Sequence, residues 1–96
     1  MASNTRIISG SISQKATTVT DSATAIPSSG NLGGRRTMLV QNRGSASIFV
    51  GDSAVTTSTG VEMTSGDEKE FQVADQVTLY GITASGTSDV RTLEGY

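Results

Sequence analysis

The chain has 96 residues and a mass of 9.9 kDa, which is room for one domain. Ser, Thr and Gly fill 39 positions and Ile, Leu, Val and Phe only 20, so the composition predicts a thin hydrophobic core. The absence of Cys and His excludes disulfides, zinc sites of the usual kind and a histidine base. Oligomerisation often stabilises small domains that lack such supports, so we expect a homo-oligomer or a subunit docked on a larger assembly.

The first third of the chain is polar, since 12 of the first 30 residues are Ser or Thr. Alternating apolar residues predict strands within 6–13 and 16–20, and the Pro- and Gly-rich stretch 26–34 is typical of a loop. We therefore predict that residues 1–34 form an extended polar arm and loop, partly in strand conformation. No basic segment followed by an apolar one opens the chain, so we expect no secretory signal.

From residue 35 on, short β-strands separated by turns are predicted. The Gly-containing stretch Asn42–Ser45 has the length and composition of a hairpin loop, and Ala84–Thr87 those of a tight turn. Alternation with a period of two predicts inward-facing side chains at Met38, Val40, Ala46, Ile48, Val50, Val61, Met63, Phe71, Val73, Val77, Leu79 and Val90.

The fold class follows from these patterns. No segment has the apolar spacing of an amphipathic helix, and Val, Ile and Thr together number 28. About six to eight short strands predict an all-β protein, a small antiparallel β-sandwich or barrel. Residues 35–96 would form this compact module and residues 1–34 the arm.

Charge is divided unevenly along the chain, whose net charge is −2. Residues 1–48 contain five Lys or Arg against one Asp, and residues 49–96 contain two against eight Asp or Glu. Such asymmetry would let one subunit attract the next. Alternatively, both signs simply face solvent, where single charges contribute little.

The sequence offers little catalytic chemistry. A nucleophile–His pair is impossible, and neither a nucleophile elbow nor a phosphate-binding Gly-rich loop is present. A Ser–Lys catalytic pair would need a buried lysine, and Lys15 and Lys69, which lie near Ser13 and Ser65, are expected in polar turns. The acidic group Asp67, Glu68 and Glu70 is expected to be a solvated rim, not a calcium site. We expect no enzyme activity, no cofactor, no metal and no small-molecule ligand.

A nucleic-acid partner is not expected either. Arg35, Arg36 and Arg43 form a small basic group, but the chain is net acidic and its four aromatic residues are scattered. These arginines would instead pair with the acidic half of a neighbouring subunit. Tyr80 falls on the opposite strand face from Leu79, so another strand or chain is expected to cover it.

Five short stretches follow one another in the second part of the chain: Arg36–Asn42, Ile48–Gly51, Gly60–Asp67, Leu79–Ile82 and Asp89–Glu94. In this order they resemble the small β-rich virion proteins of tailed bacteriophages, over about residues 35–95. The resemblance implies a non-enzymatic module of a phage particle. Such a module is either a capsid decoration (cement) protein that stabilises the outer shell, or a tail, neck or fibre module for attachment or receptor binding.

This interpretation predicts a protein made in the host cytoplasm and located on the capsid surface. We expect a homotrimer that binds the major capsid protein or another virion protein, and no membrane partner. The N-terminal arm would add a strand to a neighbour's sheet, unless residues 1–12 form a disordered tail. The residues expected to contact a partner are Arg6, Ile7, Ile8, Ile12, Arg35, Arg36 and Tyr80.

Overall fold

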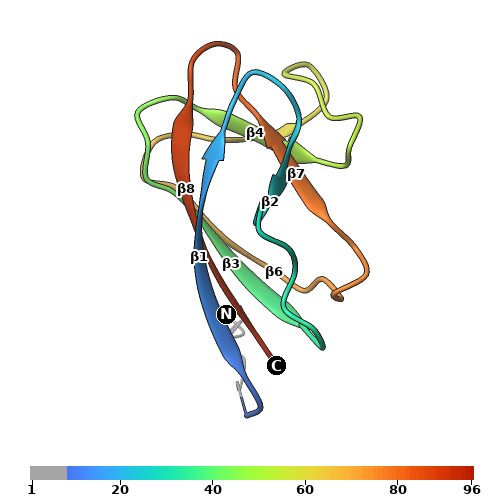
Figure 1. Cartoon of the computed structure of the whole chain (residues 1–96). Helices are drawn as coiled ribbons and strands as arrows, with labels where there is room; N and C mark the ends of the chain where they lie inside the picture. Colours follow the sequence, from blue (N-terminus) through green and yellow to red (C-terminus); the bar gives the residue numbers. More distant parts are fainter. Residues whose placement is uncertain (1–8) are drawn as a thin grey trace, which may run out of the picture.

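The computed structural model describes residues 9–96, which form eight β-strands and no helix (Figure 1). The predicted all-β class and β-sandwich are therefore confirmed. The strands are β1 (Ile12–Val19), β2 (Thr24–Ile26), β3 (Thr37–Asn42), β4 (Ile48–Gly51), β5 (Val61–Met63), β6 (Glu68–Phe71), β7 (Leu79–Ile82) and β8 (Ser88–Gly95).

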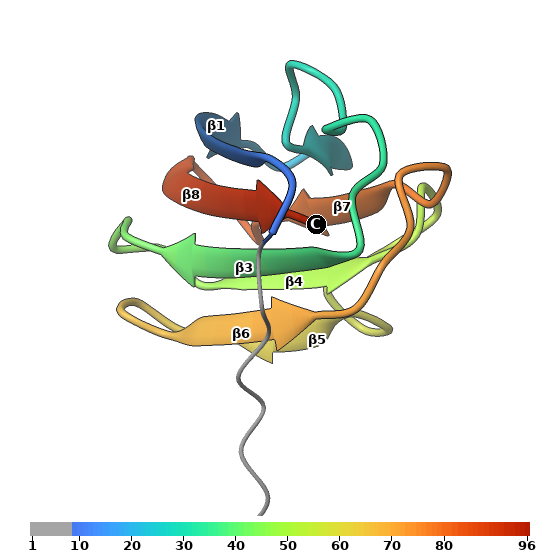
Figure 2. The ribbon, with the colours of Figure 1, turned by 90° about the horizontal axis from the view of Figure 1, so that it is seen from below.

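The strands form two four-stranded antiparallel sheets, which Figure 2 shows one behind the other. The first sheet has the order β1-β8-β3-β6 and the second has the order β2-β7-β4-β5. Of the strands that follow one another in the chain, only β4 and β5 pair in the same sheet, so the chain crosses between the sheets at nearly every turn. Eight strands in this order make a jelly roll.

The expected hairpin at Asn42–Ser45 is wrong, because β3 and β4 lie in different sheets. Here the chain crosses from β3 in the first sheet to β4 in the second, and the buried Asn42 side chain stabilises this connection. Its Nδ2 donates to the carbonyl oxygens of Ala46 at 3.0 Å and Met63 at 2.9 Å. Its Oδ1 accepts from Ser88 Oγ at 2.6 Å and from Gly44 N at 3.2 Å. The amide thus makes four hydrogen bonds and joins three turns at one end of the sandwich.

The core fills the space between the sheets, and most of the predicted inward positions are correct. The residues predicted to face inward in β3, β4 and β8 are buried. Phe71, Val73 and Leu79 pack against the same buried cluster. Two predictions are wrong: Val61 lies in the edge strand β5 and is 58% exposed, and Val77 precedes β7 and is 55% exposed. The buried cluster consists of Val19, Ile26, Met38, Val40, Ile48, Val50, Met63 and Val90.

Residues 12–26 belong to the sandwich itself. The whole of β1 pairs with β8, from Ile12 opposite Gly95 to Val19 opposite Ser88. The strand β2, which lies partly in the stretch expected to be a loop, pairs with β7 and buries Ile26. The expected division at residue 34 therefore does not separate two structural units within residues 9–96. Residues 1–8, the first part of the predicted arm, lie outside the described residues.

Candidate functional site

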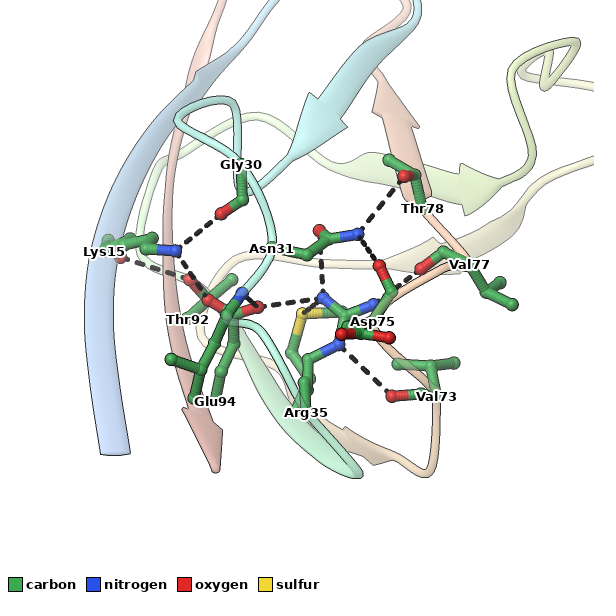
Figure 3. Close-up of polar contacts among 12 residues, drawn as sticks. Lys15, Gly30, Asn31, Arg35, Val73, Asp75, Val77, Thr78, Thr92 and Glu94 are labelled. Carbon is green, nitrogen blue, oxygen red and sulfur yellow. Dashed lines mark hydrogen bonds and ion pairs between the residues drawn. The ribbon is translucent and has the colours of Figure 1, made fainter. Parts of the chain in front are cut away.

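An ion pair lies inside the sandwich between the connection 27–36 and β8 (Figure 3). Nη1 of Arg35 is 2.9 Å from Oε2 of Glu94, and neither side chain is exposed to solvent. Nζ of Lys15 approaches the other carboxylate oxygen at 3.1 Å and also donates to the Gly30 carbonyl. Lys15 therefore lies in β1 and not in the expected turn, and its ammonium is tied to a carboxylate.

The Arg35 guanidinium is fully hydrogen-bonded. It donates to the carbonyl oxygens of Val73 at 3.2 Å, Ala74 at 2.9 Å and Val77 at 2.6 Å, and to Asn31 Oδ1 at 3.1 Å. These bonds fasten the connection between β6 and β7 to the connection between β2 and β3. A buried charge is tolerated only with such complete pairing, so the cluster has a structural role.

The Glu94 carboxylate remains ionised in this environment. Burial raises the pKa of Glu94, but hydrogen bonds from the Leu32 N–H, Lys15 and Arg35 outweigh it and hold the pKa below the ordinary value. Oε1 of Glu94 is buried, and its partner within residues 9–96 is the Lys15 ammonium at 3.1 Å. Two cations thus face one anion inside the protein.

The prediction that Arg35 contacts a partner is wrong, because this residue is 1% exposed. Its carboxylate partner lies 59 positions away, which no local pattern reveals. The adjacent Arg36 is exposed and its N–H donates to the Gly95 carbonyl at 3.0 Å. Ile12, which pairs opposite Gly95, is 54% exposed. The structure therefore brings Arg36 and Ile12 to one end of the first sheet; Arg6, Ile7 and Ile8 lie outside the described residues.

Tyr80 lies far from these residues, on the outer face of the second sheet. It is half-buried, as are its neighbours on this face, Phe49 and Ile82, which pair opposite each other. The connection 52–60 folds over part of the same face, since a Cβ added at Gly51 would lie 2.9 Å from the buried Val55 side chain. The connection 52–60 thus covers part of the sheet face on which Tyr80 lies.

The outward side of the first sheet carries a second group of apolar side chains. Leu39 and Leu93 lie directly opposite each other on β3 and β8, and both are half-buried. They face outward because Met38 and Val40 occupy the core. Gln14 and Glu70 continue the row to either edge. We name this surface the first-sheet outer face; its members are Gln14, Ala16, Leu39, Gln41, Glu68, Glu70, Arg91 and Leu93.

A shallow, open hollow of about 580 Å³ lies on this face beside the leucine pair. Its charges are partly matched, because Arg91 pairs with Asp89 at 3.0 Å. Hydrogen bonding to Arg91 holds the pKa of Asp89 below its ordinary value. The Arg43 guanidinium has no ion-pair partner within residues 9–96. The lining residues are Gln14, Lys15, Ala16, Gln41, Arg43, Arg91 and Thr92.

No local pattern in the sequence predicts this surface. Alternation indicates that Leu39 points outward, but the pairing that sets Leu93 beside it joins strands far apart in the chain. The sequence places Arg43 in a basic group with Arg35 and Arg36. The structure separates that group, since Arg35 is buried and Arg36 and Arg43 flank the two ends of β3.

Neither a metal cluster nor a membrane-spanning helix is found within the part of the chain that the structure describes. No three His, Cys, Asp or Glu side chains among residues 9–96 are placed to hold a metal ion. No helix there is long and apolar enough to cross a membrane. Comparison of the chain with protein-family models, curated proteins and solved structures finds no match.

Proposed function

We propose that this protein is a non-enzymatic structural protein of a phage virion that decorates the capsid. In this role it binds the outer shell through the first-sheet outer face. The jelly-roll strand order supports the proposal, because viral capsid domains use this fold, although lectins and cupins use it too. A fold alone does not specify a function. The resemblance of residues 35–95 to small virion proteins favours the viral alternative.

The Leu39–Leu93 pair is the observation that carries the proposal. The two side chains form an apolar centre on a sheet whose other outward residues are mainly polar, such as Gln14, Gln41 and Arg91. An apolar centre within a polar rim is the usual anatomy of a protein–protein interface. Repetition over a symmetric shell would then combine many weak contacts into stable coverage.

The test is binding of the purified protein to shells of the phage that encodes it, prepared without this protein. We expect co-sedimentation in hundreds of copies per particle, as shell symmetry requires. Leu93→Arg should reduce binding tenfold or more, because it inserts a charge at the apolar centre. The matched control Thr57→Arg adds the same charge on the exposed connection 52–60 and should bind like the unmodified protein.

Equal binding of both variants would contradict the leucine pair as the contact site. The number of copies per particle also distinguishes capsid decoration from the alternative function, which is attachment at the tail, neck or a fibre. A dozen copies or fewer per particle would support that alternative and contradict capsid decoration.

A further inference from the structure

The two sheets have four edge strands, and three of them are protected against pairing with another chain. The edges β2 and β5 contain only three residues each. The edge β6 carries three consecutive charged residues, Glu68, Lys69 and Glu70. Short edges and charged edges both discourage strand addition. The remaining edge strand, β1, has eight residues and neither Pro nor Gly.

The free backbone groups of β1 follow from its register with β8. Tyr96 N donates to Ser11 O, so odd-numbered residues of β1 exchange hydrogen bonds with β8. The bond from Arg36 N to Gly95 O supports this parity. The Gly95 carbonyl points toward β3, so Gly95 does not exchange hydrogen bonds with the even-numbered residue Ile12 opposite it. The N–H and C=O groups of the even-numbered residues Gln14, Ala16 and Thr18 consequently point to the open edge. Within residues 9–96 no other strand pairs with this edge.

The side chains of β1 also leave the edge uncharged. The outward residues Ile12, Gln14, Ala16 and Thr18 are exposed and carry no charge. Lys15, the only ionisable residue of the strand, points inward to Glu94, with its ammonium 3.1 Å from Oε1. A free inward-pointing charge on an edge strand discourages pairing with another strand. The Lys15 charge has little of this effect, because the Glu94 carboxylate neutralises it. The edge is therefore long, regular and free of exposed charge.

We propose that β1 pairs antiparallel with β1 of a second copy of this chain, across a twofold axis at Ala16. The two first sheets then form one continuous eight-stranded sheet. This dimer differs from the homotrimer expected from the sequence. Gln14 and Ala16 also belong to the first-sheet outer face, but the edge pairing uses their backbone groups and the proposed shell contact centres on Leu39 and Leu93, so neither proposal depends on the other.

The free backbone groups and the side chains of β1 together select the register. A twofold axis at any residue of β1 sets even-numbered residues opposite even-numbered ones, so the free N–H and C=O groups allow an axis at Lys15 as well as at Ala16. An axis at Ala16 sets Gln14 opposite Thr18 of the second copy and uses all three free positions. An axis at Lys15 would bring two ammonium groups opposite each other, which is unfavourable. The small Ala16 side chain meets its own copy without crowding.

Sedimentation equilibrium measures the mass of the complex directly. The unmodified protein should show the mass of two chains of 9.9 kDa. Ala16→Lys and Ala16→Glu should each weaken self-association tenfold or more, because like charges meet at the axis. An equimolar mixture of the two variants should restore a 1:1 heterodimer by native mass spectrometry. Failure of the mixture to associate would overturn the register.

A backbone test distinguishes edge pairing from side-chain contacts. Ala16→Pro removes an N–H that faces the open edge and leaves the bonds to β8 intact, so it should yield a folded monomer. Ala16→Ser retains the N–H and should remain a dimer. Circular dichroism and urea unfolding verify that both variants are folded. A dimeric Ala16→Pro protein, a trimeric unmodified protein or a monomer at millimolar concentration would each overturn the proposal.

Discussion

Arg35 and Glu94 are 59 positions apart in the chain and form a 2.9 Å ion pair that solvent does not reach. The pair joins the connection 27–36 to β8, which lies between β1 and β3 in the first sheet. Desolvation of two charges is costly, so the pair contributes specificity of structure more than net stability. Removal of either partner, however, leaves a buried charge without compensation.

Arg35→Met should therefore destabilise the protein by about 3–5 kcal/mol, the usual cost of breaking a buried ion pair. Urea unfolding measures the loss. The adjacent exposed residue supplies the control, and Arg36→Met should change stability by no more than about 0.5 kcal/mol. The double variant Arg35→Met, Glu94→Met should cost less than the two single variants together. Simple additivity would contradict the coupling.

Protonation of Glu94 at low pH should lower the free energy of unfolding of the protein. The folded-state pKa of this carboxyl lies below its ordinary value of 4.5. The stabilisation is therefore complete above that value and is lost as pH falls through the folded-state pKa. Unfolding free energies measured from neutral pH downward should converge for the unmodified protein and Glu94→Gln. A constant gap at every pH would argue against this. Asp89→Asn should alter the acid response little, because its pair with Arg91 is exposed.

Asn42→Ala should cost about 2–4 kcal/mol, since it removes a hydrogen-bond partner of the Ser88 hydroxyl and of the Ala46 and Met63 carbonyls. Asn42→Asp preserves the size of the side chain but, when ionised, cannot donate to the carbonyls of Ala46 and Met63. It should therefore be less stable at neutral pH than the unmodified protein and regain part of the difference on acidification. Thermal unfolding at two pH values tests this, and equal loss at both would contradict the donor role.

Gly44→Ala should destabilise the turn after β3 by steric overlap. A Cβ at this position would lie 2.0 Å from Ser88 Oγ and 2.7 Å from Asp89 N. Overpacking of this kind costs about 1–3 kcal/mol. Ser88→Ala in the same chain should recover only part of the loss, because the backbone overlap persists. At Gly33 an added Cβ meets nothing within 4 Å, so Gly33→Ala serves as the control. Equal effects of Gly44→Ala and Gly33→Ala on the midpoint of urea unfolding would contradict the steric argument.

The sequence predicted those parts of the fold that depend on local alternation. Met38 and Val40, like Ile48 and Val50, are buried as expected because side-chain direction in a strand alternates from one residue to the next. Alternation fails where a strand ends or lies at an edge. Val61 shares its predicted face with the buried Met63, but it lies in the edge strand β5 and is exposed.

The sites depend on pairings between distant segments, which alternation cannot predict. Asn42–Ser45 has the composition of a hairpin loop, yet the bonds of Asn42 to Met63 and Ser88 make it a crossing between sheets. In the same way, the Gly-rich sequence before Arg35 indicates a surface position for this residue. Its burial is explained only by the ion pair with the distant Glu94. The leucine pair and the open β1 edge likewise emerge only from the strand order.

The central position of β8 in the first sheet has a consequence for synthesis. β8 is the last of the eight strands in chain order, and it pairs with both β1 and β3. While the ribosome still holds residues 88–95, β1 has no neighbour in its sheet, and only β4 and β5 can form a hairpin. Assembly then requires closure of long loops, which makes folding slow. The nascent chain thus carries an unpaired β1 until β8 has left the ribosome.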